Sequence, residues 1–144
     1  MAIIKRETTV KASADSVWIS LIDDPNRWGE WLTPIRGVEE RVEEPVREGL
    51  EFHVQLGKLS AKVKVTEAVP GSRLRWKAGP GMMMAMGMSM RGTLEFQPVN
   101  GATHVFLRMV TPMMMGPMMR MMSGLNPKEE MTKTIERIRV LSNT

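Results

Sequence analysis

Apolar and polar residues alternate with a period of two through the middle of the chain, which is the pattern of half-buried β-strands. Tight-turn signals at Gly57-Lys58, Pro70-Gly71 and Asn100-Gly101 separate several of these segments. Short turns join antiparallel neighbours, so the pattern predicts one antiparallel sheet. The predicted strands cover residues 3–11, 35–43, 50–56, 61–66, 73–78, 84–96 and 103–109.

Helical signals lie near the two ends of the chain. Ser13 is a good N-cap residue ahead of an apolar stripe, which predicts a helix over 13–22, and Asp24-Pro25 predicts a second short helix. Asn126-Pro127 starts a C-terminal helix, which is the long element available to cover the apolar face of the sheet. The buried stripe of this last helix is Met131, Ile135, Ile138 and Leu141.

Length and composition limit the class of protein. A chain of 144 residues is expected to form a single domain over 1–144 and to bury a core without disulfide or metal support. The sequence has no cysteine, which excludes disulfides and cysteine nucleophiles. It shows no secretion signal and no apolar run long enough to span a bilayer, so a cytoplasmic location is expected.

The inward strand faces are almost entirely apolar and carry no acid, base or nucleophile. General acid–base catalysis needs a titratable group within hydrogen-bond reach of its proton, so this wall favours binding over catalysis. His53 and His104 are predicted on the outer face of the sheet. The predicted inward set is Phe52, Val54, Leu56, Val63, Val65, Leu74, Trp76, Met84, Met86, Met88, Met90, Leu94, Val105, Leu107 and Met109.

Methionine is concentrated in two clusters, and 14 of the 16 methionines lie between Met82 and Met122. Flexible, polarizable methionine side chains suit adaptable apolar binding surfaces, although they also fill cores. We expect the first cluster to alternate along a strand and the segment 112–122 to form a flexible lid, so that both meet across one cavity. A soft-metal site is a further alternative, because thioethers select Cu(I), but the alternating spacing and the scarcity of histidine argue against it.

The net charge of +4 invites a nucleic-acid interpretation, but lysine and arginine alternate with apolar residues instead of forming blocks, so no nucleic-acid partner is expected. The basic residues predicted on the convex face are Lys62, Lys64, Arg73, Arg75, Lys77, Arg91 and Arg108. Such a set is usually a solvated surface. It also suits transient contact with anionic lipid headgroups.

Several segments resemble the START-like, polyketide cyclase/dehydrase-type SRPBCC superfamily. They are Thr8 to Trp18 (TTVKASADSVW), Leu21 to Asp24 (LIDD), Trp28 to Trp31 (WGEW) and Gly101 to Val105 (GATHV). The resemblance implies an α+β helix-grip fold, with a curved seven-stranded antiparallel sheet around the C-terminal helix and two short helices after the first strand. It also implies a deep cavity for a lipid, hormone, quinone-like molecule or polyketide, and it carries no universal catalytic motif.

The sequence therefore predicts binding or transport of a hydrophobic small molecule such as a lipid, isoprenoid, quinone or polyketide. A polyketide cyclase/aromatase-like enzyme is the alternative, and a protein–protein adaptor that uses an exposed methionine surface is a third hypothesis. No cofactor or bound metal is expected, and the oligomeric state is left open. The predicted ligand-binding residues are Trp28, Trp31, Phe52, Trp76, Met84, Met86, Met88, Met90, Met109, Met113, Met115, Met118, Met119 and Met122.

Overall fold

The computed structural model of the chain describes residues 2–112, 124 and 126–143. Its main element is a seven-stranded antiparallel sheet with the order β1-β7-β6-β5-β4-β3-β2. The first strand therefore pairs with the last, and β1 and β2 form the two edges. The strands are β1 (Ala2–Val10), β2 (Ile35–Val38), β3 (Glu51–Leu56), β4 (Leu59–Val69), β5 (Arg73–Gly79), β6 (Met90–Val99) and β7 (Ala102–Thr111).

The helices begin where the sequence predicts caps. Ser13 accepts a hydrogen bond from the backbone N–H of Ser16 at 3.2 Å, and Asp24 accepts one from Asn26 at 3.0 Å. Asn126 caps the C-terminal helix by accepting from the N–H of Lys128 at 3.1 Å. The helical elements are α1 (Ala14–Val17), the π-helical turn η1 (Trp18–Ile22), the 3-10 turn η2 (Pro25–Arg27), α2 (Trp28–Trp31), α3 (Gly81–Ala85) and α5 (Pro127–Ser142).

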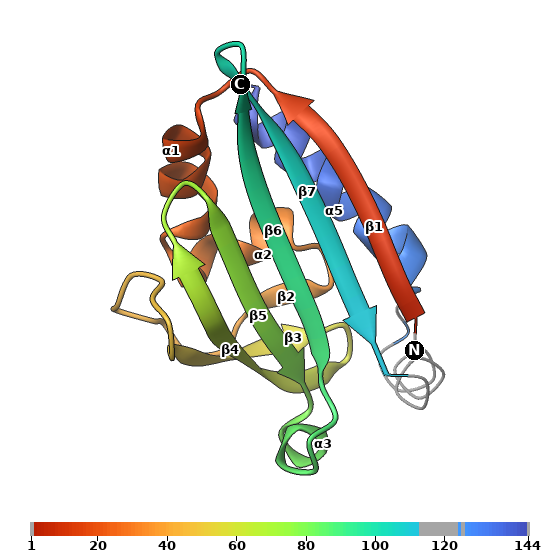
Figure 1. Cartoon of the computed structure of the whole chain (residues 1–144). Coiled ribbons are helices and arrows are strands. Elements are labelled where there is room, and N and C mark those ends of the chain that lie inside the picture. The colour runs from red at the N-terminus through yellow and green to blue at the C-terminus, as the bar shows by residue number, and fades with distance from the viewer. Residues whose placement is uncertain (1, 113–123, 125, 144) are drawn as a thin grey trace.

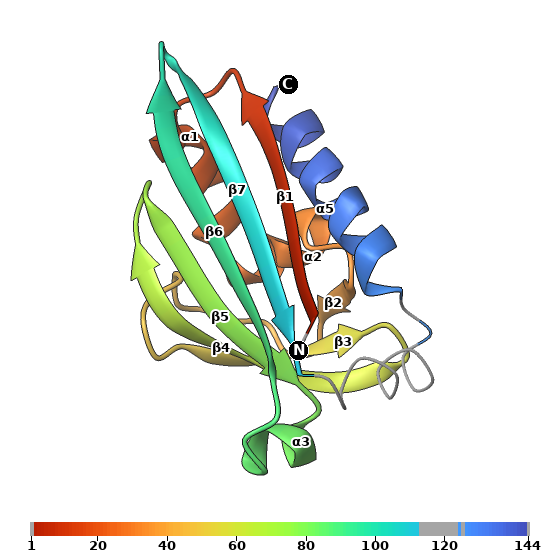
Figure 2. The same ribbon diagram turned by 45° about the vertical axis from the view of Figure 1, so that its right-hand side comes forward.

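Among the described helices, all except α3 lie on one face of the curved sheet (Figure 1). Helix α5 runs along this face beside β1, and the α1–α2 segment covers the part nearer β5 and β6 (Figure 2). The buried stripe of α5 is the predicted one, because Met131, Ile135 and Ile138 are buried and Leu141 packs against the core. The chain therefore has the α+β helix-grip architecture that the resemblance implies.

The core follows the predicted alternation along most strands. Phe52, Val54 and Leu56 of β3 are buried, as are Leu74 and Trp76 of β5. Gly92 of β6 pairs in register with Trp76, and a Cβ atom at Gly92 would overlap the indole ring. Glycine at this position thus lets the Trp76 side chain lie directly against the neighbouring strand.

The prediction that Met84, Met86 and Met88 alternate along a strand is wrong. Residues Gly81–Ala85 form the short helix α3, and β6 begins only at Met90. Methionine is a good helix former, and a Schellman motif ends this helix. In that motif Gly87 has a φ of 79°, its N–H bonds the Met84 carbonyl at 3.0 Å, and the Met88 N–H bonds the Met83 carbonyl at 2.8 Å.

The strand predicted over 35–43 is also too long, because β2 ends at Val38. The following segment leaves the sheet and is held by Asn26 instead. The Val42 N–H donates to the Asn26 side-chain oxygen at 2.9 Å, and the Asn26 amide donates to the Val42 carbonyl at 2.7 Å. The Asn26 side-chain amide thus satisfies the backbone N–H and C=O of Val42, which would otherwise need a neighbouring strand as hydrogen-bond partner.

Candidate functional site

An apolar slot lies between the sheet and the start of α5. The empty space between its walls is about 590 Å³ including the open mouth, whereas the centre of a water molecule reaches only about 40 Å³ of it. The slot is therefore narrow. Its described lining residues are Leu32, Pro34, Ile35, Leu56, Val63, Trp76, Ala78, Met90, Met109, Pro127, Glu130 and Met131.

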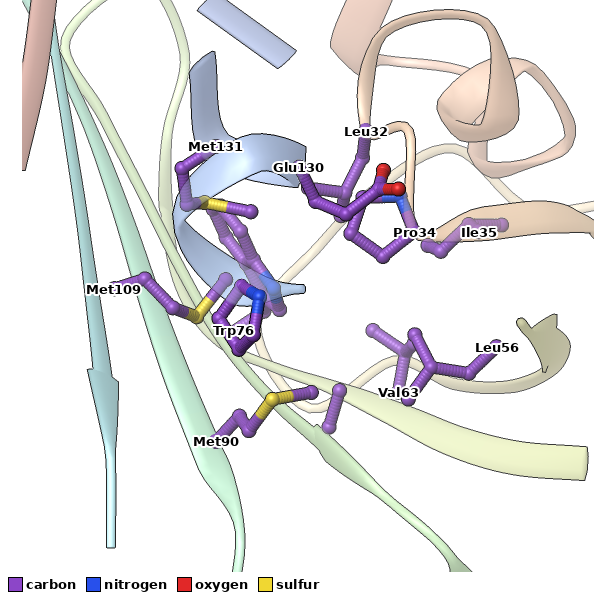
Figure 3. Close-up of a pocket in the computed structure, with 12 residues that line it drawn as sticks. Leu32, Pro34, Ile35, Leu56, Val63, Trp76, Met90, Met109, Glu130 and Met131 are labelled. Carbon is purple, nitrogen blue, oxygen red and sulfur yellow. The ribbon is translucent and has the colours of Figure 1, made fainter. Parts of the chain in front are cut away.

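Three methionines form much of one side of the slot. Figure 3 shows the side chains of Met90, Met109 and Met131 around Trp76, facing Leu56 and Val63 across the slot. Met109 is 5% exposed and Met131 is 2% exposed, whereas Met90 is only partly buried. Unbranched thioether side chains change rotamer readily, so this wall can change shape more easily than a wall of branched residues.

An aromatic cluster supports the slot from within the core. The Trp28 ring lies 5.4 Å from Trp31, 5.3 Å from Phe52 and 5.8 Å from Trp76, measured between ring centroids. The indole N–H groups donate to backbone carbonyls, Trp28 to Ile22 at 2.9 Å and Trp31 to Leu21 at 2.8 Å. The indoles are thus fixed in orientation as well as buried.

Of the four aromatic residues predicted to bind the ligand, only Trp76 lines the slot. Trp76 lines the slot, whereas Trp28 and Trp31 have no exposed surface and lie behind it in the core rather than at its mouth. Phe52 is likewise buried within the aromatic cluster. This placement favours a packing role for Trp28 and Trp31 over a mouth-lining role.

The predicted methionine site is divided in the structure. Met90 and Met109 line the slot. Met84 lies in α3, Met86 is its C-cap and Met88 lies between α3 and β6, and none of the three is among the residues that line the slot. The proposed meeting of two methionine clusters depends on residues outside the described part of the chain, and the roles of its members remain predictions. Those residues are Met113, Met115, Met118, Met119 and Met122.

Met131 and Glu130 belong to the slot but were not predicted as site residues. Met131 was identified from the sequence as part of the buried stripe of the last helix, and that stripe was the available signal for its position. Glu130 precedes Met131 on the first turn of α5, outside the predicted apolar stripe. A charged residue next to a buried stripe is usually solvated, so the sequence contains no signal for its burial.

Glu130 borders the slot and is only 5% exposed, and its carboxylate contacts residues that do not line the slot. The Thr33 hydroxyl donates a hydrogen bond to it at 2.6 Å. Arg36 and Lys133 approach its other oxygen at 3.8 Å each, and their own side chains are 55% and 63% exposed. Among the described lining residues Glu130 is the one with a charge, but its carboxylate adds almost no polar surface to the slot, so the wall is apolar.

The outer face of the sheet carries the predicted basic residues. Lys62 pairs with Glu51 at 2.9 Å, a hydrogen bond that lowers the pKa of the Glu51 carboxyl, and Arg73 pairs with Glu67 at 3.1 Å. Other cations face cations, because Lys77 is directly opposite Arg91 and Lys5 is directly opposite Arg108. Like charges directly opposite each other destabilise a sheet, so these cation pairs are expected to lower its stability.

Helix α3 projects beyond the ends of β5 and β6 in both ribbon views (Figures 1 and 2). Met82 is 79% exposed and Met86 is 67% exposed, whereas Met83 is buried. The two strands that carry α3 also reach the slot, because Ala78 and Met90 line it and are register partners. The exposed methionines, which we call the α3 tip (Met82 and Met86), therefore lie at the end of the strands that bound the slot.

Metal-ligand clusters and membrane-spanning helices were sought among the described residues. Among them no group of three or more histidine, aspartate or glutamate side chains is arranged to hold a metal ion. That finding does not address a thioether site, so it does not test the Cu(I) alternative. Within the same part of the chain, no helix is both long enough and apolar enough to cross a membrane.

The architecture recurs in solved structures of low sequence identity. The Aha1 dimer from Colwellia psychrerythraea matches with a TM-score of 0.73 and 14% identity, over 99% of this chain and 97% of that chain. Protein CV1439 from Chromobacterium violaceum matches with a TM-score of 0.69 and 16% identity, over 99% and 97%. These likenesses show a shared fold.

A third likeness is to DynU16, a protein from the dynemicin biosynthetic locus. It has a TM-score of 0.65 and 18% identity, and the alignment covers 96% of this chain but only 46% of DynU16.

No curated protein matches the chain. A family model described as polyketide cyclase / dehydrase and lipid transport matches residues 1–139. The chain therefore belongs to the polyketide cyclase/dehydrase and lipid transport family, whose description points to hydrophobic ligand binding or a cyclase-like role.

Proposed function

We propose that the protein binds and carries a hydrophobic small molecule in the slot between the sheet and α5. The observation that carries this proposal is the composition of the wall, where Glu130 is the one charged residue among the described lining residues. Apolar surface removed from water contributes about 25 cal/mol per Å² before ordering costs are subtracted. A slot of this composition therefore favours lipid, isoprenoid, quinone or polyketide ligands over polar metabolites.

The slot has to widen to take such a ligand. The volume open to the centre of a water molecule is about 40 Å³, which accommodates a few waters and is too small for a long acyl chain. Met90, Met109 and Met131 are the side chains best suited to move, because methionine has three freely rotating side-chain bonds. The proposal thus includes a rearrangement of these side chains when the ligand enters.

Native mass spectrometry of the purified protein, followed by organic extraction and analysis of the extract, tests the proposal. We expect a bound hydrophobic molecule to be carried with the protein and released on denaturation. If nothing co-purifies, the test continues by titration with acyl, isoprenoid and quinone probes. Absence of any saturable binding would contradict the proposal.

We further propose that ligand exchange takes place at an anionic membrane surface. The α3 tip displays two exposed methionines, and Lys77 and Arg91 lie close by on the strands that carry it. Basic residues near an anionic membrane contribute about 1 kcal/mol each, and exposed apolar side chains add to this by entering the interface. Docking through this tip would bring the shared strand ends, and with them the slot, toward the lipid.

Vesicle co-sedimentation tests the membrane step. We expect binding to vesicles that contain phosphatidylserine, weaker binding to neutral phosphatidylcholine vesicles, and a loss of affinity at high salt. Equal binding to both vesicle types would remove the electrostatic contribution, and no binding to either would contradict the membrane step while leaving ligand binding untouched.

A cyclase-like reaction is retained as a second candidate because of Glu130. That alternative requires at least one titratable group at the cavity, and Glu130 is the one titratable residue among the described lining residues. Its carboxylate would have to turn from Thr33 toward the slot to act on a substrate. The carboxylate is already engaged by Thr33, and none of the other described lining residues is titratable, so a reaction would depend on this one acid. Turnover of a polyketide substrate that is lost in Glu130→Gln would favour the enzyme over the carrier.

A further inference from the structure

We propose that a hollow on the outer face of the sheet binds a compact anion that carries several phosphate groups. Four neighbouring strands, β1, β7, β6 and β5, form this hollow, and they lie in front of α5 and α2 in Figure 1. The centre of a water molecule reaches about 400 Å³ of the hollow, compared with about 40 Å³ of the slot. The proposal goes beyond the proposed function, because it needs no ligand in the slot.

The hollow and the slot lie on opposite faces of the same strands. Consecutive residues of a strand point to opposite faces of a sheet. Three arginines line the hollow, and each is adjacent in the chain to a residue that lines the slot. These pairs are Arg75 and Trp76, Arg91 and Met90, and Arg108 and Met109. The alternation that makes the slot apolar thus gathers arginines on the other side of the sheet.

Cations outnumber carboxylates in the walls of the hollow. The cations are Lys5, Arg6, Arg75, Arg91 and Arg108, and the carboxylates are Glu7 and Glu95. Arg6 is held by α5, because its Nε donates to the Thr132 hydroxyl at 3.0 Å. Within the described part of the chain, the other four cations are in no ion pair. Their charges are therefore available to an anion from solution.

The strand register places these cations in a row. Lys5 is directly opposite Arg108, Arg108 is opposite Thr93, and Thr93 is opposite Arg75. Neighbouring strands are about 4.8 Å apart, so the backbones at Arg75 and Arg108 are about 10 Å apart. Arg91 lies two residues from Thr93 on the same strand, about 7 Å away. This spread favours an anion with several charged groups over a single phosphate.

The side chains of the row suit phosphate chemically. A guanidinium can donate two parallel hydrogen bonds to a phosphate, and Arg75 and Arg108 supply one guanidinium each. The Thr93 hydroxyl, between them in the row, adds an uncharged donor. Lys5 and Arg108 repel each other while the hollow is empty, and an anion between them removes that repulsion. An arrangement that lowers stability in this way is typical of functional sites.

The neighbouring row limits the length of the ligand. Phe106 is directly opposite Glu7 on one side and Glu95 on the other, and all three line the hollow. Two carboxylates at this end repel a phosphodiester chain that continues past the basic row. The concave shape also requires the ligand to enter the hollow and not to lie flat across it. Both features favour a compact polyphosphate over a nucleic acid strand.

Isothermal titration of the full chain with tripolyphosphate tests the proposal. At low salt we expect one site with a Kd below about 100 μM. Orthophosphate should bind at least about tenfold more weakly, because it reaches fewer cations. The affinity for tripolyphosphate should fall as salt is added, since the cations are exposed.

Three variants separate a built site from general attraction to a basic protein. Arg108→Gln should weaken tripolyphosphate binding by at least about fivefold, because it removes a charged donor from the row. Thr93→Val should weaken it by about threefold without any change in net charge. The matched control is Lys64→Gln, which removes a cation from the same face outside the hollow and should change the affinity by less than about twofold.

Two further probes distinguish a free anion from a lipid headgroup. These probes are soluble inositol trisphosphate and vesicles that contain phosphatidylinositol bisphosphate. A free polyphosphate is the favoured source if tripolyphosphate binds at least as tightly as inositol trisphosphate. A headgroup is favoured if inositol trisphosphate and the vesicles bind more tightly, and both results support the phosphate site.

The opposite outcomes are equally clear. Lack of saturable binding by both soluble anions would overturn the proposal, whatever the vesicles do. Equal losses of affinity in Arg108→Gln and Lys64→Gln would also overturn it, because the attraction would then come from net charge alone. If Arg108→Gln does not fold, Arg75→Gln at the other end of the row takes its place, with the same expected loss.

Discussion

Methionine occupies two opposite environments in this protein, and the contrast separates the slot from the α3 tip. Met109 and Met131 in the slot wall are 5% and 2% exposed, whereas Met82 and Met86 in the α3 tip are 79% and 67% exposed. The side chain is the same, so its surroundings decide what it contributes. In the slot wall methionine fills space and can change rotamer when a ligand enters, and at the α3 tip it presents apolar surface to a partner.

The largest effect that distinguishes the two regions concerns stability. Met131→Ala should lower the free energy of unfolding by about 2–5 kcal/mol, because it leaves a cavity beside Trp76. Met86→Ala should change it by less than about 0.5 kcal/mol, because an exposed side chain gains little from folding. Urea denaturation of both variants measures the difference. Similar losses in the two would show that the α3 tip is packed and not free.

A second difference lies in the two glycines near these regions. Gly92→Ala should destabilise the protein by about 1–3 kcal/mol, because its new Cβ atom overlaps the Trp76 indole in the slot wall. Gly81→Ala at the start of α3 meets no atom within 4 Å and should be neutral or slightly stabilising. Thermal unfolding of both variants makes the comparison. An unchanged melting temperature for Gly92→Ala would mean that the indole moves aside without cost.

The strands and caps were predictable from the sequence because each depends on neighbours close in the chain. The alternation along β3, β4 and β5, the caps at Ser13 and Asn126 and the turn at Asn100-Gly101 all follow from local geometry. The helix-grip arrangement was predicted through the family resemblance and is found in the structure.

The first methionine cluster was not predictable from its alternation alone. Met84, Met86 and Met88 fit a strand pattern, but helix propensity and the left-handed Gly87 produce a closed helical turn. Gly87 was a usable signal, since glycine at that position often ends a helix. The burial of Glu130 had no local signal, because it depends on Thr33, which lies 97 residues away in the chain.

Membrane affinity should depend on the α3 tip, whereas stability depends on the slot wall. The double variant Met82→Ser/Met86→Ser should weaken binding to phosphatidylserine vesicles by about 1–2 kcal/mol, since it removes the exposed apolar surface of the α3 tip. Met82→Leu/Met86→Leu is the matched control and should retain binding. Co-sedimentation measures both. If the serine variant binds as well as the leucine variant, the tip is not the docking element.

The smallest expected effect concerns the opposed cations on the outer face. Lys77→Gln removes one member of the Lys77–Arg91 pair, so it should weaken anionic vesicle binding by about 1 kcal/mol. The same change should stabilise the fold by roughly 0.2–1 kcal/mol, because like charges no longer face each other across two strands. Binding and denaturation of this one variant are measured together. A loss of stability would contradict the repulsion argument.

The most direct test of the account is a ligand titration followed by NMR of ¹³C-labelled methionine methyl groups. With dodecan-1-ol and no membrane present, we predict that the methyl signals of Met90, Met109 and Met131 shift with saturation, because these side chains line the slot and move to admit the ligand. The signals of Met82 and Met86 should stay in place. Unchanged slot signals, or shifts confined to the α3 tip, would contradict ligand binding in the slot.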